Sequence, residues 1–246
     1  MDFNQMRSSQ GFGSNLTALG RKLLIIYGII YVAELLLEHW FKIPVASYFS
    51  LHQFNDANFR FWQILTHPFL HDPGSPLGFL IICLVFYFFS GPVEKAFGPV
   101  GFLWLFYLSS LGGALCGLAF SGVSGFGAPF AGMTPGLLAL IVVFGFMNPE
   151  ATILLMFILP IKAKYISYGT ILFTILTFLA KANPHGAYHI GGILLGYLYS
   201  RKFGNPPDLK LMHLKYQKWK LDRRRSRFRV IDGFKDKDDD DKPTYH

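Results

Sequence analysis

The most prominent pattern in this chain is a series of six apolar runs separated by polar segments. The runs cover about residues 23–37, 77–90, 100–120, 136–147, 166–180 and 190–203. Hydrophobic residues make up 52% of the chain and charged residues 15%, whereas soluble globular chains have about 25% charged residues. We therefore expect an all-α membrane protein with six transmembrane helices, and not a soluble enzyme with a large core.

The basic residues are sorted to one side of these runs. Arg21 and Lys22 precede the first run, Lys95 lies between the second and third, and Lys162 and Lys164 lie between the fourth and fifth. The connections after the first, third and fifth runs contain few basic residues. Because Lys and Arg are retained in cytoplasmic loops, we expect both termini to be cytoplasmic.

The fourth run is too short to cross a membrane alone. Its 12 residues span roughly 18 Å as a helix, against a hydrocarbon core of roughly 30 Å. A Gly-rich segment, 121–132, precedes it, and irregular backbone persists at membrane depth only where protein buries it or water reaches it. We therefore predict a re-entrant Gly-rich loop that lines a cavity, with Thr134 at the cavity floor.

The remaining segments differ from the runs in composition. Residues 39–76 are aromatic and polar, so we expect a long loop with short interfacial helices, and we expect residues 151–161 to dip into the interface. The predicted domains are a disordered cytoplasmic N-terminus at 1–20, a six-helix membrane domain at 21–204 and a cytoplasmic tail at 205–246.

The tail has a distinctive charge pattern. Residues 208–230 contain nine Lys and Arg residues interleaved with Leu and Trp, and residues 236–241 then reverse the charge. A basic segment with interspersed hydrophobic residues can lie on an anionic inner leaflet. We therefore predict a basic helix followed by an acidic end, with an anionic lipid surface as its partner and no nucleic acid.

Two residues far apart in the sequence could form a catalytic pair. Thr134 lies in the segment 132–136, which opens the fourth run, and His189 opens the last apolar helix. A hydroxyl and an imidazole are what a nucleophile–base pair needs, and an ionisable residue within a membrane bundle is a functional candidate by default. Two alternatives remain: Thr134 followed by Pro135 is a good helix start, and His189 could be a neutral residue bonded to Thr134 or to a loop carbonyl.

Other prominent residues have structural interpretations. Gly192 and Gly196 are spaced to let helices approach closely, and Glu94 is expected to satisfy loop backbone groups. Cys83 and Cys116 lie in apolar runs and are expected to be packing residues. No Cys/His spacing indicates a metal site, and we predict no cofactor.

Several motifs, taken in order along residues 60–205, resemble those of the rhomboid superfamily of intramembrane serine proteases. Their residues are Trp62 to His71, Ser90 to Gly98 with Glu94 and Gly98, Gly132-Met133-Thr134 followed by Gly136, Leu159 to Tyr165, and His189 with Gly192 and Gly196. The resemblance implies a six-helix bundle in which a Ser attacks the peptide bond and the His is its base. It also implies a bacterial-type inner (plasma) membrane location, because the segment Leu159 to Tyr165 resembles one common in bacterial rhomboids.

The chain departs from the family pattern at four positions. The resemblance implies Thr134 in place of the nucleophilic Ser, and Pro135 in place of a Gly. It also implies that the residues that help to hold the oxyanion, a His and an Asn, are replaced by Phe79 and Cys83. Removal of one oxyanion donor typically slows acyl transfer roughly 100–1,000-fold.

The interpretation that these departures favour is a rhomboid-fold pseudoprotease. It would bind transmembrane segments of partner proteins, or act as a subunit of a larger membrane complex, without cleaving them. The alternative is an active intramembrane endopeptidase that uses Thr134 and His189. A transporter lacks support, because the sequence has no inverted repeat and no chain of intramembrane carboxylates.

Overall fold

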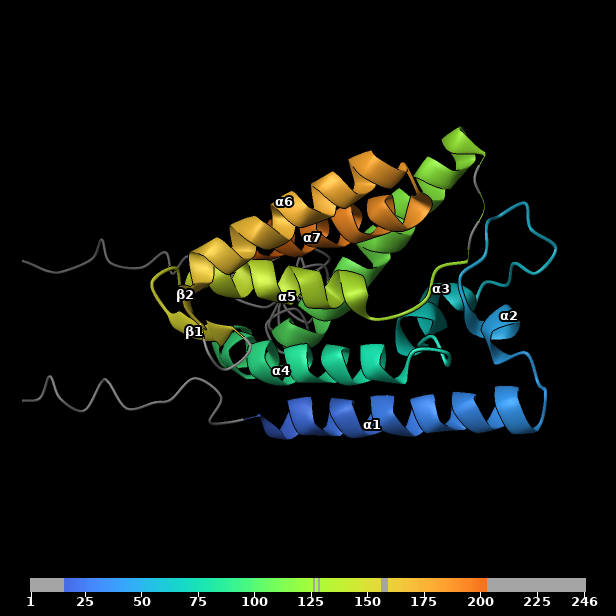
Figure 1. The fold of residues 1–246 in the computed structure, drawn as a ribbon, viewed down its shortest axis with the longest axis horizontal. Helices are drawn as coiled ribbons and strands as arrows, with labels where there is room; N and C mark the ends of the chain where they lie inside the picture. The colour runs from blue at the N-terminus through green and yellow to red at the C-terminus, as the bar shows by residue number, and fades with distance from the viewer. Residues whose placement is uncertain (1–15, 126, 128, 156–158, 203–246) are drawn as a thin grey trace, which may run out of the picture. The chain divides into compact units, whose positions relative to one another are not determined.

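Helices form most of the regular structure in the computed structural model, which describes residues 16–125, 127, 129–155 and 159–202 (Figure 1). The N-terminal residues 1–15 and the tail from 203 onward lie outside the described residues, so the predictions made for them stay predictions. In chain order the elements are α1 (Ala18–Leu35), the π-helical η2 (Leu36–Trp40), α2 (Val45–Phe49), α3 (Gln63–Thr66), the 3-10 helix η3 (His67–Phe69), α4 (Pro76–Ser124), α5 (Thr134–Met147), β1 (Thr152–Leu155), β2 (Leu159–Lys162), α6 (Ala163–Lys181) and α7 (Pro184–Lys202).

The 49-residue element α4 consists of two helices that meet at Gly98. Gly98 has φ +72° and ψ 165°, a conformation that residues with a side chain rarely adopt. Pro99 follows it and has no N–H to continue the preceding helix. The sequence Gly98-Pro99 therefore separates the second and third apolar runs, as the pattern predicts.

The core is formed where α4, α5 and α7 pack together, and α6 covers the remaining side of α5 and α7 (Figure 1). Close approach between these helices depends on glycine. A Cβ added at Gly196 would lie 2.5 Å from the Cβ of Ala139, and one added at Gly136 would lie 2.8 Å from the Phe106 ring. Both glycines therefore have the packing role that the sequence indicates for Gly196.

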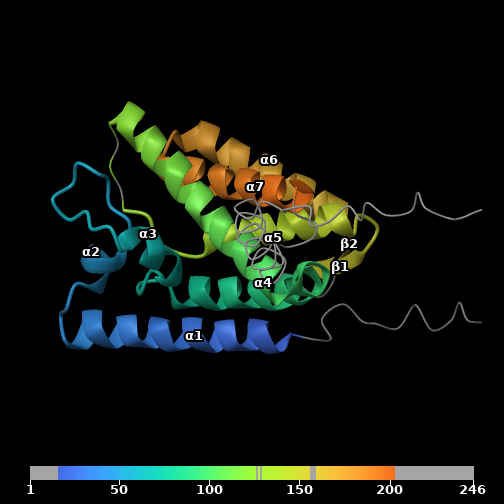
Figure 2. The ribbon, with the colours of Figure 1, turned by 180° about the vertical axis from the view of Figure 1, so that it is seen from behind.

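The first helix, α1, lies alongside the first half of α4 (Figure 1, Figure 2). At one end of this contact the hydroxyl of Thr17, the N-cap of α1, donates to Glu94 of α4. Glu94 is buried, but it binds a side-chain hydroxyl and not the loop backbone that we expected. Its carboxylate thereby holds the start of α1 against α4.

The transmembrane prediction is supported at a coarse level. Among the residues that the structure describes, three helices are long and apolar enough to cross a membrane, namely Ala18–Trp40, Pro76–Ser124 and Ala163–Ala180. Helical segments also cover the other apolar runs, so the structure is that of a helical membrane protein, while the count of six spans stays a prediction.

The segments between the long helices contain more regular secondary structure than their composition predicts. Residues 39–76 contain the short helices expected there. Strands β1 and β2 pair antiparallel, with Thr152 opposite Lys162 and Leu155 opposite Leu159. The described residues are therefore mostly helical, with one small pair of strands.

Candidate active site

Thr134 is the first residue of α5, and Met133 occupies the cap position before it. No side chain caps this helix, so the interpretation of Thr134 as an N-cap is wrong. Pro135 takes the second helical position, where its missing N–H leaves no intrahelical bond unmade. The Thr-Pro pair thus begins the helix through the ring of Pro135 and not through the hydroxyl of Thr134.

The loop before Thr134 is held by backbone hydrogen bonds from distant segments. Leu51 and Phe130 exchange two N–H···O bonds of 2.8 Å, and the N–H of Gly132 donates to the carbonyl oxygen of His67 at 2.8 Å. Gly132 has φ +97°, a left-handed conformation that favours glycine. The approach to Thr134 is therefore fixed by the chain between α1 and α4.

His67 is fully buried next to this loop. Its Nδ1–H donates to the carbonyl oxygens of Gln63 and Ile64, each at 3.0 Å. Burial lowers the pKa of His67 to about 4, because the charged imidazolium would lose its hydration. His67 is therefore a neutral residue that supports the loop, and we assign it no part in proton transfer.

Pro135 fills the space where α5 meets both α4 and α7. A Cβ added at Gly113 of α4 would lie 3.0 Å from the Cβ and Cγ of Pro135. A Cβ added at Gly192 of α7 would lie 2.8 Å from the Cα and 2.9 Å from the carbonyl oxygen of Pro135. Pro135 is buried, so the residue after Thr134 is a packing contact among three helices.

The sequence suggests that His189 opens the last apolar helix, but α7 begins at Pro184. The imidazole is half-buried. Although Thr134 and His189 are both described, no hydrogen bond joins their side chains within the described part of the chain. The bond to Thr134 proposed for a neutral His189 is therefore not made.

Tyr188, the neighbour of His189, makes the connection between α7 and the loop before Thr134. Its hydroxyl donates to the carbonyl oxygen of Gly132 at 3.0 Å, and its ring stacks on Phe130 with centroids 5.0 Å apart. The side chain is 1% exposed. Sequence reasoning missed Tyr188, since a Tyr in an apolar helix carries no signal of its partner.

Phe79 and Cys83 lie on the first half of α4. Phe79 is buried, and its ring stacks on Tyr31 of α1 with centroids 4.1 Å apart and planes at 14°. It also meets the ring of His71 edge-on at 5.2 Å. Cys83 is a free, half-buried cysteine packed against the core. Neither side chain carries an amide or imidazole donor.

The chemistry available to this arrangement is limited. Among the described residues, no group of three or more His, Cys, Asp or Glu side chains could hold a metal ion. Within the described ranges no base is bonded to the hydroxyl of Thr134. Pro135 has no N–H to offer a developing negative charge. The glycines Gly132, Gly136, Gly192 and Gly196 position the helices and carry no reactive group.

Comparison with known proteins agrees with the motifs. The family model of the rhomboid domain matches residues 58–206, which is more than half of the chain. No curated protein matches the sequence. The matched range contains Phe79, Cys83, Glu94, Thr134, Pro135 and His189, together with the glycines that let α4, α5 and α7 approach closely. This chain therefore belongs to the rhomboid family.

Proposed function

We propose that this protein is a rhomboid pseudoprotease that binds transmembrane segments of partner proteins without cleaving them, either alone or as a subunit of a larger membrane complex. The observation that carries the proposal is the packing of Pro135 between Gly113 and Gly192. A residue that follows a catalytic hydroxyl can donate a backbone N–H only if it is not proline. Here the residue is proline, and its ring fills the junction of α4, α5 and α7.

The expected loss of rate can be estimated from the missing donors. The family pattern places oxyanion donors at the positions of Phe79 and Cys83, and each such donor contributes roughly 3 kcal/mol to acyl transfer. Two losses would slow the reaction by roughly 10⁴-fold. A Thr nucleophile lowers the rate further, because its extra methyl group stiffens χ1 and crowds the attack.

Binding of a partner helix does not depend on these groups. The first half of α4 exposes Leu77, Leu80 and Ile81, and α6 exposes Leu172, Phe173 and Leu176. Both helices contact α5, on which Thr134 lies (Figure 1). Helices associate in membranes through van der Waals contact between such faces. These two apolar faces are therefore the proposed contact surface for a partner's transmembrane helix.

Cleavage and binding are tested separately. The purified full chain is incubated with a panel of transmembrane substrates and is expected to produce no fragments. Photo-crosslinkers at Leu80 and Leu176 are expected to capture substrate helices, whereas one at Ile29, an exposed apolar residue of α1, is expected to capture few. Equal capture at all three positions would contradict the binding surface.

Repair of the site is the sharper test of inactivity. Thr134→Ser alone is expected to restore no cleavage, because the donors at positions 79 and 83 are still absent. Cleavage by the unmodified chain that is lost in both Thr134→Ala and His189→Ala would overturn the proposal. That result would establish the alternative, an active endopeptidase with a Thr134–His189 pair.

The location of the protein is part of the proposal. The sorting of Arg21, Lys22, Lys95, Lys162 and Lys164 supports a multi-pass protein with both termini in the cytoplasm, and the family motifs support a bacterial-type inner (plasma) membrane. The basic tail is proposed to lie on the anionic leaflet. Binding of the isolated 208–230 peptide to neutral bilayers as strongly as to anionic ones would contradict the lipid role.

A further inference from the structure

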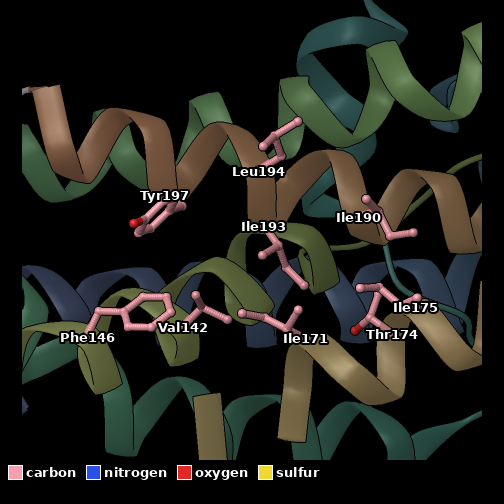
Figure 3. A pocket seen from close by; sticks show the side chains of 9 residues that line it. All are labelled: Val142, Phe146, Ile171, Thr174, Ile175, Ile190, Ile193, Leu194 and Tyr197. Atoms are coloured by element: carbon pink, nitrogen blue, oxygen red, sulfur yellow. The ribbon is translucent and has the colours of Figure 1, made fainter. Parts of the chain in front are cut away.

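An apolar groove of about 340 Å³ lies between α5, α6 and α7, away from Thr134 (Figure 3). One end is formed by Phe146 and Tyr197, whose rings are 5.3 Å apart. The other end is formed by Thr174, Ile175 and Ile190 (Figure 3). Apart from the hydroxyls of Thr174 and Tyr197, the lining side chains are hydrocarbon.

The groove is open to the outside of the helix bundle, and its lining offers few polar groups to a ligand. Ile175 and Leu194 are exposed large apolar residues at its rim. The hydroxyl of Thr174 already donates to the carbonyl oxygen of Thr170 at 2.7 Å. An occupant of the groove therefore gains from apolar contact alone.

The dimensions favour a hydrocarbon chain over a helix. From Ile190 to Tyr197 the groove follows α7 for about 10 Å at the helical rise, so 340 Å³ corresponds to a cross-section of about 30 Å². A helix about 10–12 Å in diameter has a cross-section of about 80–110 Å². A partner helix could lie over the groove, but only a narrow chain can fill it.

The charges at the Tyr197 end indicate what the chain is attached to. The guanidinium of Arg201 lies 5.9 Å from the centre of the Tyr197 ring, one helical turn beyond the groove. In the part of the chain that the structure describes, no ion pair involves Arg201. Lys162 and Lys164, by contrast, are both paired with Glu150, at 2.6 and 2.5 Å.

We propose that this groove binds one acyl chain of an anionic glycerophospholipid, with its phosphate held by Arg201. The planar guanidinium binds phosphate oxygens through two parallel N–H donors, and the Tyr197 ring orients it. The acyl chain lies along α7 between Phe146 and Ile175. This lipid would be a fixed component of the α5–α6–α7 face and not part of the exchanging bilayer.

The test measures lipid retention in the full chain by native mass spectrometry. Detergent-purified protein is mixed with phosphatidylglycerol or phosphatidylcholine that have identical acyl chains. The unmodified protein is expected to retain about five times more phosphatidylglycerol, the ratio expected from one basic residue near an anionic headgroup. Arg201→Gln is expected to remove this preference, whereas Lys95→Gln, on the side of the membrane expected for Arg201, is expected to keep it.

Blocking the groove tests the acyl chain. Ile175→Trp is expected to abolish retention of both lipids, and Leu194→Trp tests the same groove from α7 if the first variant does not fold. Leu179→Trp, at an exposed position of α6 that does not line the groove, is expected to behave like the unmodified protein.

Two results would overturn the proposal. The first is an equal loss of the phosphatidylglycerol preference in Arg201→Gln and Lys95→Gln, which would indicate an effect of general surface charge. The second is full lipid retention in both Ile175→Trp and Leu194→Trp. Capture of a polypeptide with exclusion of lipid would also overturn it.

Discussion

The hydroxyl of Tyr188 donates a 3.0 Å hydrogen bond to the carbonyl oxygen of Gly132, across 56 positions of sequence. This bond joins the residue before His189 to a residue two positions before Thr134. The side chains of Thr134 and His189 themselves share no hydrogen bond. The backbone and a tyrosine, and not the candidate dyad, thus hold the two halves of the site together.

Tyr188→Phe is expected to lower the free energy of unfolding by about 1–3 kcal/mol, because the buried carbonyl oxygen of Gly132 loses its partner. The thermal unfolding midpoint in detergent measures this change. Tyr168→Phe is the matched control, because Tyr168 is 55% exposed on α6. An equal midpoint for the two variants would contradict the role assigned to the bond.

Gly192→Ala is expected to lower the unfolding midpoint, because the new methyl group would overlap Pro135 backbone atoms that cannot move aside. The cost is expected to be about 1–3 kcal/mol. Gly28→Ala in α1 is the control: nothing lies within 4 Å of the added Cβ, and alanine favours the helix by about 0.5–1 kcal/mol. If Gly192→Ala and Gly28→Ala shifted the unfolding midpoint in the same direction, the close contact at Gly192 would not be the cause of the shift.

Phe79→Ala is expected to destabilise the protein by about 3–5 kcal/mol, as do other substitutions of Phe by Ala in cores. The change removes the stacked contact with Tyr31 and separates α1 from α4. Phe173→Ala, at a position 73% exposed on α6, is expected to have little effect on the unfolding midpoint. Similar midpoints for the two would show that the α1–α4 contact does not depend on Phe79.

Glu150 is expected to make the stability of the region around β1 and β2 depend on pH in the acid range. Hydrogen bonds from Lys162 and then Lys164 lower the pKa of this carboxyl from 4.5 to about 2. Because the folded state favours the ionised form, the stabilisation is present above pH 4.5 and is lost as the pH falls toward 2. Glu150→Gln should therefore differ from the unmodified protein in unfolding midpoint at neutral pH and low salt.

This difference should vanish near pH 2. It should also shrink with added salt, because the ion pairs are exposed. A difference that is constant from pH 7 to pH 2 would exclude the carboxylate as its source.

A reporter fused after residue 246 is expected to read out in the cytoplasm, because the basic residues favour that side. A second reporter in the loop at residues 53–58 is expected to read out on the opposite side, one span away. A periplasmic C-terminus together with a cytoplasmic loop would show that the orientation is inverted. A periplasmic C-terminus together with a periplasmic loop would rule out six spans.

The sequence predicts the helices well because periodic apolar content and glycine spacing are local properties. The runs at 77–90 and 100–120 coincide with the two halves of α4, and Gly98-Pro99 marks their boundary. The family assignment likewise rests on motifs that can be seen in order. The helices and the family can therefore be predicted without knowing which side chains contact each other.

The parts that were missed depend on contacts between distant segments. The bond from Tyr188 to Gly132 and the pairing of Leu51 with Phe130 involve residues that no local pattern distinguishes. The apolar pattern predicts a helix start at His189, because Pro184 to Tyr188 are not strongly apolar, whereas α7 begins at Pro184. The pair Thr134-Pro135 favours an N-cap at Thr134, and only the backbone shows that Met133 holds that position.

The position of Pro135 sets helix packing against backbone hydrogen bonding at a single residue. Substitution of Pro135 by Gly would supply a backbone N–H, but it would also leave an unfilled space between Gly113 and Gly192. The donor and the close contact of α4, α5 and α7 therefore exclude each other: the same substitution that gains the N–H removes the ring that fills the junction of the three helices.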